Sequence, residues 1–350
     1  MNPTTDRDGN RTPSIMDAIT HATPHATPYA NLTPDCVLDA LESCGLQVDG
    51  RMLALNSYEN RVFQVGIDRD DQARSDSFVV VKFYRPHRWS DVQILEEHSF
   101  ARELNEQEIP VVAPLEIAGQ TLHSHAGFRF AVFPRRGGRI PELERADVLH
   151  WIGRFLGRIH AVGARAPFVH RPALNIDTFG IASRDFLLQG NFVPDDLRAV
   201  WKSVIDQALD ETQRGFMRVG PVASLRLHGD CHAGNVLWTP DGPHFVDLDD
   251  ARNGPAVQDL WMLLSGDASA MQTQLAHVLE GYRMFHPLNT DECALIEPLR
   301  TLRLIHYAAW LARRWQDPAF PAAFPWFGTT RYWQERIQEL REQIALMQEA

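Results

Sequence analysis

The chain has no long hydrophobic run and little cysteine. None of its apolar stretches reaches the ~20 residues of a membrane-spanning helix, and its polar beginning lacks the apolar core of a secretory signal. Only four cysteines occur in 350 residues, with no CxxC pair and no zinc-binding spacing. These absences argue against transmembrane and disulfide-rich classes, and we expect a cytoplasmic protein that contacts no membrane.

Positive charge is also scarce. Lysine and arginine together number 34 against 45 aspartates and glutamates, so the formal net charge is −11. Such a chain is a poor general binder of nucleic acids, although a few well-placed cations suffice for a nucleotide. The length and an apolar content of 44% predict a large core that is divided between two lobes.

Two polar stretches contain the residue types that phosphoryl transfer needs. They are residues 227–235, LHGDCHAGN, and residues 245–250, FVDLDD. A hydroxyl acceptor needs a carboxylate that orients it and takes its proton, and Mg²⁺ prefers hard oxygen ligands. Asp230 is therefore the candidate base, while Asn235 and Asp247 are the candidate Mg²⁺ ligands. The pattern indicates a phosphotransferase that uses ATP, with Asp230 and Asp247 as its catalytic residues.

A short hairpin is predicted between these stretches. Residues 236–238 and 244–246 are apolar and strand-like, and the sequence TPDGP at 239–243 is a turn signal. The hairpin would return Asp247 to the side of the loop that carries Asp230 and Asn235. Asp249 and Asp250, taken alone, are interpreted as carboxylates of a solvated loop.

The rest of the chain divides into a β-rich part and a helical part. Residues 1–30 are rich in Thr, Pro and His and predict a disordered tail, and Thr33 with Pro34 predicts a helix start. Five strands and one helix are expected in the β-rich part: strands 51–57, 61–67, 78–84, 110–115 and 128–133, and helix 90–107. Further helices are expected at 195–215, 256–264, 271–285, 291–317 and 331–347.

This order predicts an α+β fold of two lobes. A small antiparallel sheet with one main helix forms an ATP-binding lobe at residues 31–133, a hinge follows at 134–141, and a helical catalytic lobe with the hairpin spans 142–350. A cleft between two such lobes is a natural place for a ligand.

These motifs resemble the aminoglycoside phosphotransferase/choline kinase family, whose fold is similar to that of protein kinases. Several stretches resemble, more specifically, a bacterial branch of stress-response kinases: LNSYENRV at 55–62, VKFYRP at 81–86, ILEEH at 94–98 and ARNGPAVQDLW at 251–261. The likeness covers residues 31–340. It implies a cytoplasmic kinase that phosphorylates Ser or Thr in proteins and uses ATP and Mg²⁺.

The resemblance also assigns roles around the nucleotide. It implies that Lys82 contacts the α- and β-phosphates and pairs with a helix glutamate, for which Glu97 is preferred to Glu96 and to Glu103. The turn at 56–61 takes the place of a glycine-rich loop but contains no glycine.

In that turn, Asn56, Ser57 and Asn60 are expected to cover the phosphates, with Ser57 closest to ATP. Residues 130–134 align with the linker that holds adenine. Asp259 is expected to brace the catalytic loop through backbone hydrogen bonds, and His228 is expected to be structural.

Alternatives remain open at this point. A small-molecule kinase that acts on an amino alcohol, a sugar or an aminoglycoside-like acceptor would use the same three side chains. An acidic acceptor pocket would favour a cationic small molecule, whereas an open groove would favour a polypeptide. A scaffold that binds nucleotide without turnover is the second alternative, and a nucleophilic Cys231 is a third that no neighbouring relay supports. The protein is expected to be a monomer.

Overall fold

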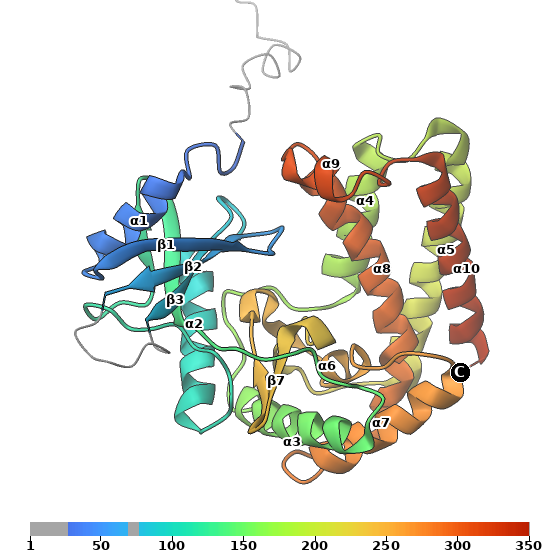
Figure 1. Cartoon of the computed structure of the whole chain (residues 1–350). Helices are drawn as coiled ribbons and strands as arrows, with labels where there is room; N and C mark the ends of the chain where they lie inside the picture. The colour runs from blue at the N-terminus through green and yellow to red at the C-terminus, as the bar shows by residue number, and fades with distance from the viewer. Residues whose placement is uncertain (1–26, 69–76, 350) are drawn as a thin grey trace, which may run out of the picture.

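The computed structural model describes residues 27–68 and 77–349, which form a sheet lobe and a helical lobe (Figure 1). Most of the predicted tail at 1–30 lies outside the described residues. Tyr29, however, is buried against the sheet, and its hydroxyl donates hydrogen bonds to the carbonyl oxygens of Glu59 and Phe83. Ordered structure therefore begins before the position that the sequence predicted. Among the described residues, no helix combines the length and apolar character that a membrane crossing requires.

The sheet lobe contains five antiparallel strands in the order β1-β2-β3-β5-β4. Their bounds are β1 Val48–Leu55, β2 Arg61–Ile67, β3 Phe78–Phe83, β4 His123–His125 and β5 Phe128–Pro134. Helix α1, Pro34–Ser43, begins as predicted, because the Thr33 side chain accepts a hydrogen bond from the backbone N–H of Cys36. Helix α2, Asp91–Glu106, is the main helix of this lobe.

The predicted strand at 110–115 is wrong. Pro110 and Pro114 carry no backbone N–H, so the segment cannot supply a regular ladder. It makes a single parallel bridge between Val111 and Phe245 instead. This bridge connects the sheet lobe to the hairpin of the helical lobe.

The helical lobe contains two packed groups of helices (Figure 1). Helices α3 and α7 pack against each other beneath the hairpin, and α5, α8 and α10 form a second group. The bounds are α3 Ala146–Gly163, α4 Ala182–Gln189, α5 Asp195–Val219, α6 Val257–Trp261, α7 Ala268–Tyr282, α8 Ile296–Arg313, α9 Ala319–Ala323 and α10 Thr330–Glu349. The sequence did not predict α4, α9 or the π-helical turn at Ile176–Ile181.

Two small antiparallel strand pairs flank the loops that carry Asp230 and Asp247. The predicted hairpin is present as β7, Val236–Thr239, and β8, Gly242–Phe245, and β6, Leu225–Leu227, pairs with β9, Arg252–Gly254. Gly242 has φ +112°, and a Cβ there would lie 2.4 Å from the Trp151 ring of α3. Glycine therefore lets the hairpin turn lie directly on α3.

Candidate active site

The loop that follows β6 is held by one buried carboxylate. Asp259 of α6 accepts hydrogen bonds from the backbone N–H groups of His228 and Gly229, each at 2.8 Å, and from His160 Nε2 at 3.0 Å. The side chain of His228 donates to the carbonyl of Val246 at 2.9 Å. The bracing role predicted for Asp259 and the structural role predicted for His228 are both confirmed. Fixing the backbone in this way fixes the position of the next residue, Asp230.

Asp230 lines the cleft and lies between the side chains of Arg303 and His232. Its Oδ1 is 2.7 Å from Arg303 Nη1 of α8, and its Oδ2 is 3.5 Å from His232 Nε2. Burial alone would raise the pKa of Asp230, but His232 and the Arg303 charge hold that pKa below its ordinary value. The group is therefore an ionised carboxylate at neutral pH. Nothing in the local sequence pointed to Arg303, because it lies 73 positions farther along the chain.

Asn235 and Asp247 supply oxygen atoms near this carboxylate. The Asn235 amide nitrogen donates to the carbonyl of Asp230 at 2.9 Å, which leaves the amide oxygen to face a cation. Asp247 adopts a left-handed backbone, φ 60° and ψ 65°, and half of its side-chain surface is exposed. Partial desolvation inside the cleft and the neighbouring Asp249 charge raise its pKa, while Lys82 opposes the rise.

These two oxygen donors fit Mg²⁺. Magnesium ions in phosphotransferases take few protein ligands and complete their shell with phosphate and water oxygens. Within the described residues, no group of three or more His, Cys, Asp or Glu side chains is placed to hold a metal ion by itself. A site made by Asn235 and Asp247 would therefore depend on the oxygens of a bound triphosphate.

Lys82 of β3 is a buried cation surrounded by carboxylates. Its Nζ lies 3.2 Å from Glu97 Oε1, 3.5 Å from Asp247 Oδ1 and 3.6 Å from Asp249 Oδ1. The predicted choice of Glu97 as its helix partner is confirmed. The rival Glu96 instead accepts hydrogen bonds from the backbone N–H groups of residues 169–171.

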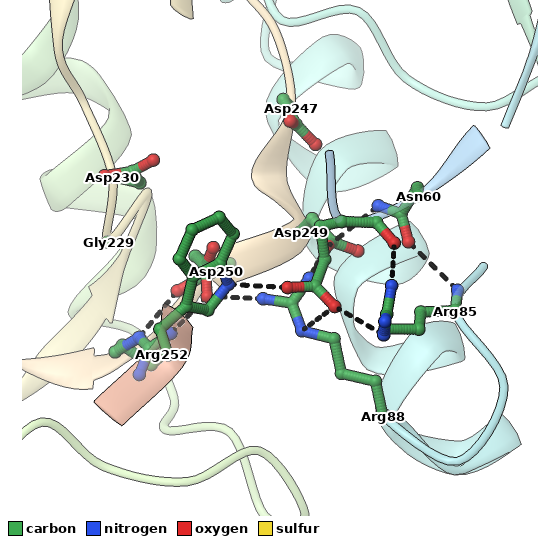
Figure 2. A network of polar contacts seen from close by, with 12 residues as sticks. Asn60, Arg85, Arg88, Gly229, Asp230, Asp247, Asp249, Asp250 and Arg252 are labelled. Carbon is green, nitrogen blue, oxygen red and sulfur yellow. Dashed lines mark hydrogen bonds and ion pairs between the residues drawn. The ribbon is translucent and has the colours of Figure 1, made fainter. Parts of the chain in front are cut away.

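The glycine-free turn between β1 and β2 is only partly as predicted. Asn56 and Ser57 line the cleft. Asn60 does not cover a phosphate site: it is buried, donates to Asp249 Oδ2 at 3.1 Å and accepts from the backbone N–H of Arg85 at 3.1 Å. Figure 2 shows Asn60 lying between the backbone of Arg85 and the side chain of Asp249. Asn60 thus joins the two lobes.

Asp249 and Asp250 are not solvated loop residues, so that prediction is wrong. Asp249 is 3% exposed and bonds to the Arg88 guanidinium. Asp250 lies 2.8 Å from Arg88 and 2.5 Å from Arg252 (Figure 2). Although burial alone would raise it, these two arginines hold the pKa of Asp250 well below its ordinary value. No local pattern predicted the pairing with Arg88, because Arg88 belongs to the other lobe.

One cleft of about 1020 Å³ is lined by Lys82, Glu97, Asp230, Asn235 and Asp247, and also by Asp249 and Asp250. The side of the cleft near Lys82 carries apolar side chains that suit a purine ring: Leu55, Val62, Val80, Phe133, Leu237 and Val246. Phe130, which the sequence placed in the adenine linker, is instead a fully buried residue of β5 paired with Phe83. The opposite side of the cleft is formed by α8.

Cys231 is buried directly behind the loop. It has no exposed surface, and burial raises the pKa of its thiol well above the ordinary value. A thiolate nucleophile is therefore disfavoured at this position.

Comparison with known proteins agrees with this geometry. The model of the phosphotransferase enzyme family matches residues 52–296. Stress response kinase A of Escherichia coli (strain K12) is 48% identical over 318 residues, which cover 91% of this chain and 94% of the relative. Serine/threonine protein kinase RdoA of Salmonella typhimurium is 46% identical over the same shares of the two chains.

The fold also has solved counterparts. The structure of amicoumacin kinase hAmiN in complex with AMP-PNP, Ca²⁺ and Ami aligns with a TM-score of 0.68 at 19% identity, over 89% of this chain and 92% of the other. This likeness confirms the predicted two-lobed α+β fold, and the relatives confirm the resemblance drawn from the motifs. The chain is therefore an enzyme that belongs to the phosphotransferase enzyme family.

Proposed function

We propose that this chain is an ATP- and Mg²⁺-dependent protein kinase of a bacterial stress response that transfers the γ-phosphoryl group to Ser or Thr. The observation that carries the proposal is the convergence of Asp230, Asn235 and Asp247 in a single cleft with the Lys82–Glu97 ion pair, where Asp247 lies 3.5 Å from Lys82. The names of relatives that are 46–48% identical over nine-tenths of the chain support a protein acceptor and a stress response.

On the nucleotide side, the chain's own residues bind and position. Lys82 contacts the α- and β-phosphates, and Glu97 holds its ammonium group in place. Ser57 lies at the rim of the cleft, where its hydroxyl and backbone N–H reach the phosphates. Asn235 and Asp247 would hold Mg²⁺, which would supply positive charge to the triphosphate.

On the acceptor side, Asp230 orients the incoming hydroxyl in line with the γ-phosphorus and accepts its proton. The transition state of phosphoryl transfer is loose, so positioning contributes more than basicity. The brace from Asp259 therefore matters as much as the charge of Asp230 itself. A cytoplasmic location and a monomeric state remain predictions.

The test is transfer of labelled γ-phosphate from ATP to candidate proteins and, in parallel, to amino alcohols. The Asp230→Asn variant should lose roughly 10²- to 10⁴-fold in turnover, the usual contribution of a catalytic base. Asp241→Asn is the matched control, because Asp241 is an exposed carboxylate at the tip of the β7–β8 hairpin that follows the loop of Asp230.

Near-normal turnover by Asp230→Asn would remove Asp230 from the role of base. Transfer to amino alcohols but to no protein would replace the protein kinase by a small-molecule kinase. Nucleotide binding without any transfer would indicate a scaffold.

A further inference from the structure

We infer that the acceptor is an acidic polypeptide segment, in which a Ser or Thr is flanked by Asp or Glu residues that bind Arg303 and Arg313 of α8. This inference rests on the proposed function and adds the chemical class of its substrate. It follows from the side chains on the wall of the cleft that faces Asp230.

The side chains that α8 contributes to that wall are cations and aromatic rings, with no acid; Glu59, from the turn between β1 and β2, meets the wall at Trp310 and is already paired with Arg314. The cleft-lining residues of α8, a helix that the structure describes in full, are Arg303, His306, Tyr307, Trp310 and Arg313. The single carboxylate of α8, Glu297, lies in its first turn outside the cleft and faces Arg300. His306 stacks on Phe179 at 4.0 Å, and burial lowers its pKa to about 3. The positive charge of the wall therefore comes from its arginines.

Arg303 lies where an acceptor must arrive. Its guanidinium is 2.7 Å from Asp230 Oδ1, and 37% of its side chain is exposed. A hydroxyl that approaches Asp230 brings its neighbouring groups against Arg303. A carboxylate next to the hydroxyl would give Arg303 a second partner and free Asp230 for the hydroxyl, whereas an ammonium group would meet a like charge.

Arg313 is a cation without an acidic partner in the described part of the chain. Its guanidinium stacks over Phe186 at 4.8 Å and makes one long contact, 3.5 Å, with the carbonyl of Ala182. Its neighbours differ: Arg314 lies 2.5 Å from Glu59, and Arg252 lies 2.5 Å from Asp250. Arg313 is exposed and its charge is therefore available to a ligand.

The spacing of the two arginines sets the length of the recognised segment. Ten residues along an α-helix correspond to about 15 Å, which an extended chain covers with roughly four to five residues. An acidic residue next to the Ser or Thr acceptor would reach Arg303. A second acidic residue, roughly four to five positions farther along an extended peptide, would reach Arg313. This wall is the opposite of the acidic pocket that a cationic amino alcohol or aminoglycoside would need.

The experiment uses the full chain and three peptides of equal length with one central Ser, flanked by Glu, by Ala or by Lys. The wild type should phosphorylate the Glu peptide with a kcat/KM about tenfold or more above that of the Ala peptide, as expected for charge-assisted contacts. The Lys peptide should be the poorest. The ratio between peptides is the readout, so a general loss of activity in a variant does not affect it.

Arg313→Glu should lower the Glu-to-Ala ratio about tenfold, and adding Arg303→Glu should make the Lys peptide the preferred one. Because Arg313 is exposed, its variant should fold even where the double variant does not. Arg341→Glu changes the net charge equally on the exposed face of α10, outside the cleft, and should leave the ratio unchanged.

Two results would overturn the inference while leaving the proposed function intact. One is equal phosphorylation of the three peptides by the wild type, and the other is a Glu-to-Ala ratio that Arg313→Glu does not alter. A different result, transfer to amino alcohols but to no peptide, would remove the proposed function itself and the inference with it.

Discussion

The two walls of the cleft differ in how their charged side chains are paired. We call the wall around Lys82 the nucleotide wall and the wall formed by α8 the acceptor wall. On the nucleotide wall, Lys82 is buried between carboxylates and Asp249 is buried against Arg88, so each charge has a partner within the protein. On the acceptor wall, Arg303 is partly exposed and Arg313 has no carboxylate partner among the described residues. A prearranged set of charges suits one fixed cosubstrate, because no reorganisation is needed when it binds. Charges left open suit a partner that supplies the opposite sign.

The two walls are also tied to each other. Glu59, in the turn between β1 and β2, accepts a hydrogen bond from Trp310 Nε1 at 2.6 Å and lies 2.5 Å from Arg314 Nε. Arg85 of the sheet lobe bonds to Asp317 at 2.9 Å. The turn that we propose to cover the nucleotide is therefore attached to the end of the helix that would bind the acceptor.

Removing the buried cation of the nucleotide wall should have the largest effect on the fold. Lys82→Met leaves Glu97 and Asp249 without that partner, and breaking a buried pair costs about 3–5 kcal/mol in the free energy of unfolding. Urea denaturation measures this loss, and Mg·ATP affinity should fall with it. Lys202→Met is the control, since Lys202 is an exposed α5 residue paired with Asp206 one turn away. Equal stabilities of the two variants would mean that the nucleotide wall does not depend on its internal charge pairs.

Weakening the brace beneath the catalytic loop should have an intermediate effect. Asp259→Asn places an amide where a carboxylate accepts two backbone N–H groups and one from His160. At least one donor then loses its partner, at a cost of about 1–3 kcal/mol. We expect a lower kcat with little change in the KM for ATP. Asp267→Asn is the matched control, because Asp267 caps the start of α7 and Asn caps a helix as well as Asp does. Its kcat should therefore stay unchanged.

An unchanged kcat in Asp259→Asn would show that the loop keeps its shape without the brace. A rise in the KM for ATP alone would instead assign the brace to the nucleotide wall.

Releasing the tie between the walls should have the smallest effect. Glu59→Gln keeps an acceptor for Trp310 but removes the charge that faces Arg314. Because Gln can still accept hydrogen bonds here, the loss should amount to about 1 kcal/mol, so the KM for ATP should rise severalfold in steady-state kinetics. Glu106→Gln, an exposed change at the end of α2, should leave KM as it is. Identical KM values for both variants would separate the turn from nucleotide binding.

The parts of the site that the sequence predicted correctly are those made by local geometry. The short hairpin brings Asp247 back toward the loop of Asp230. The Thr33 side chain caps the first turn of α1 by accepting a hydrogen bond from the backbone N–H of Cys36. Lys82, Glu97 and Asp259 were placed through the resemblance of their surrounding motifs, and their contacts agree with it. In each case the information lies within one short stretch of chain.

The parts that the sequence missed depend on contacts between distant segments. Asn60 bonds to Asp249 across 189 positions, and neither residue differs from an ordinary turn residue in its own neighbourhood. Arg303 is an unremarkable helix arginine until α8 is packed against the catalytic loop. The burial of Asp249 and the ion pair between Asp250 and Arg88 likewise exist only after the lobes meet, so no local pattern could predict them.

The division of work between the two walls is tested most directly by Mg²⁺-dependent ATP binding, measured by titration calorimetry on Asp230→Asn and on Asp247→Ala. The account predicts that Asp230→Asn, which has lost transfer, binds Mg·ATP with nearly wild-type affinity, because Asp230 serves the acceptor. It predicts that Asp247→Ala loses Mg²⁺-dependent binding, because Asp247 serves the nucleotide. Equal losses in both variants, or normal Mg·ATP affinity in Asp247→Ala, would contradict it.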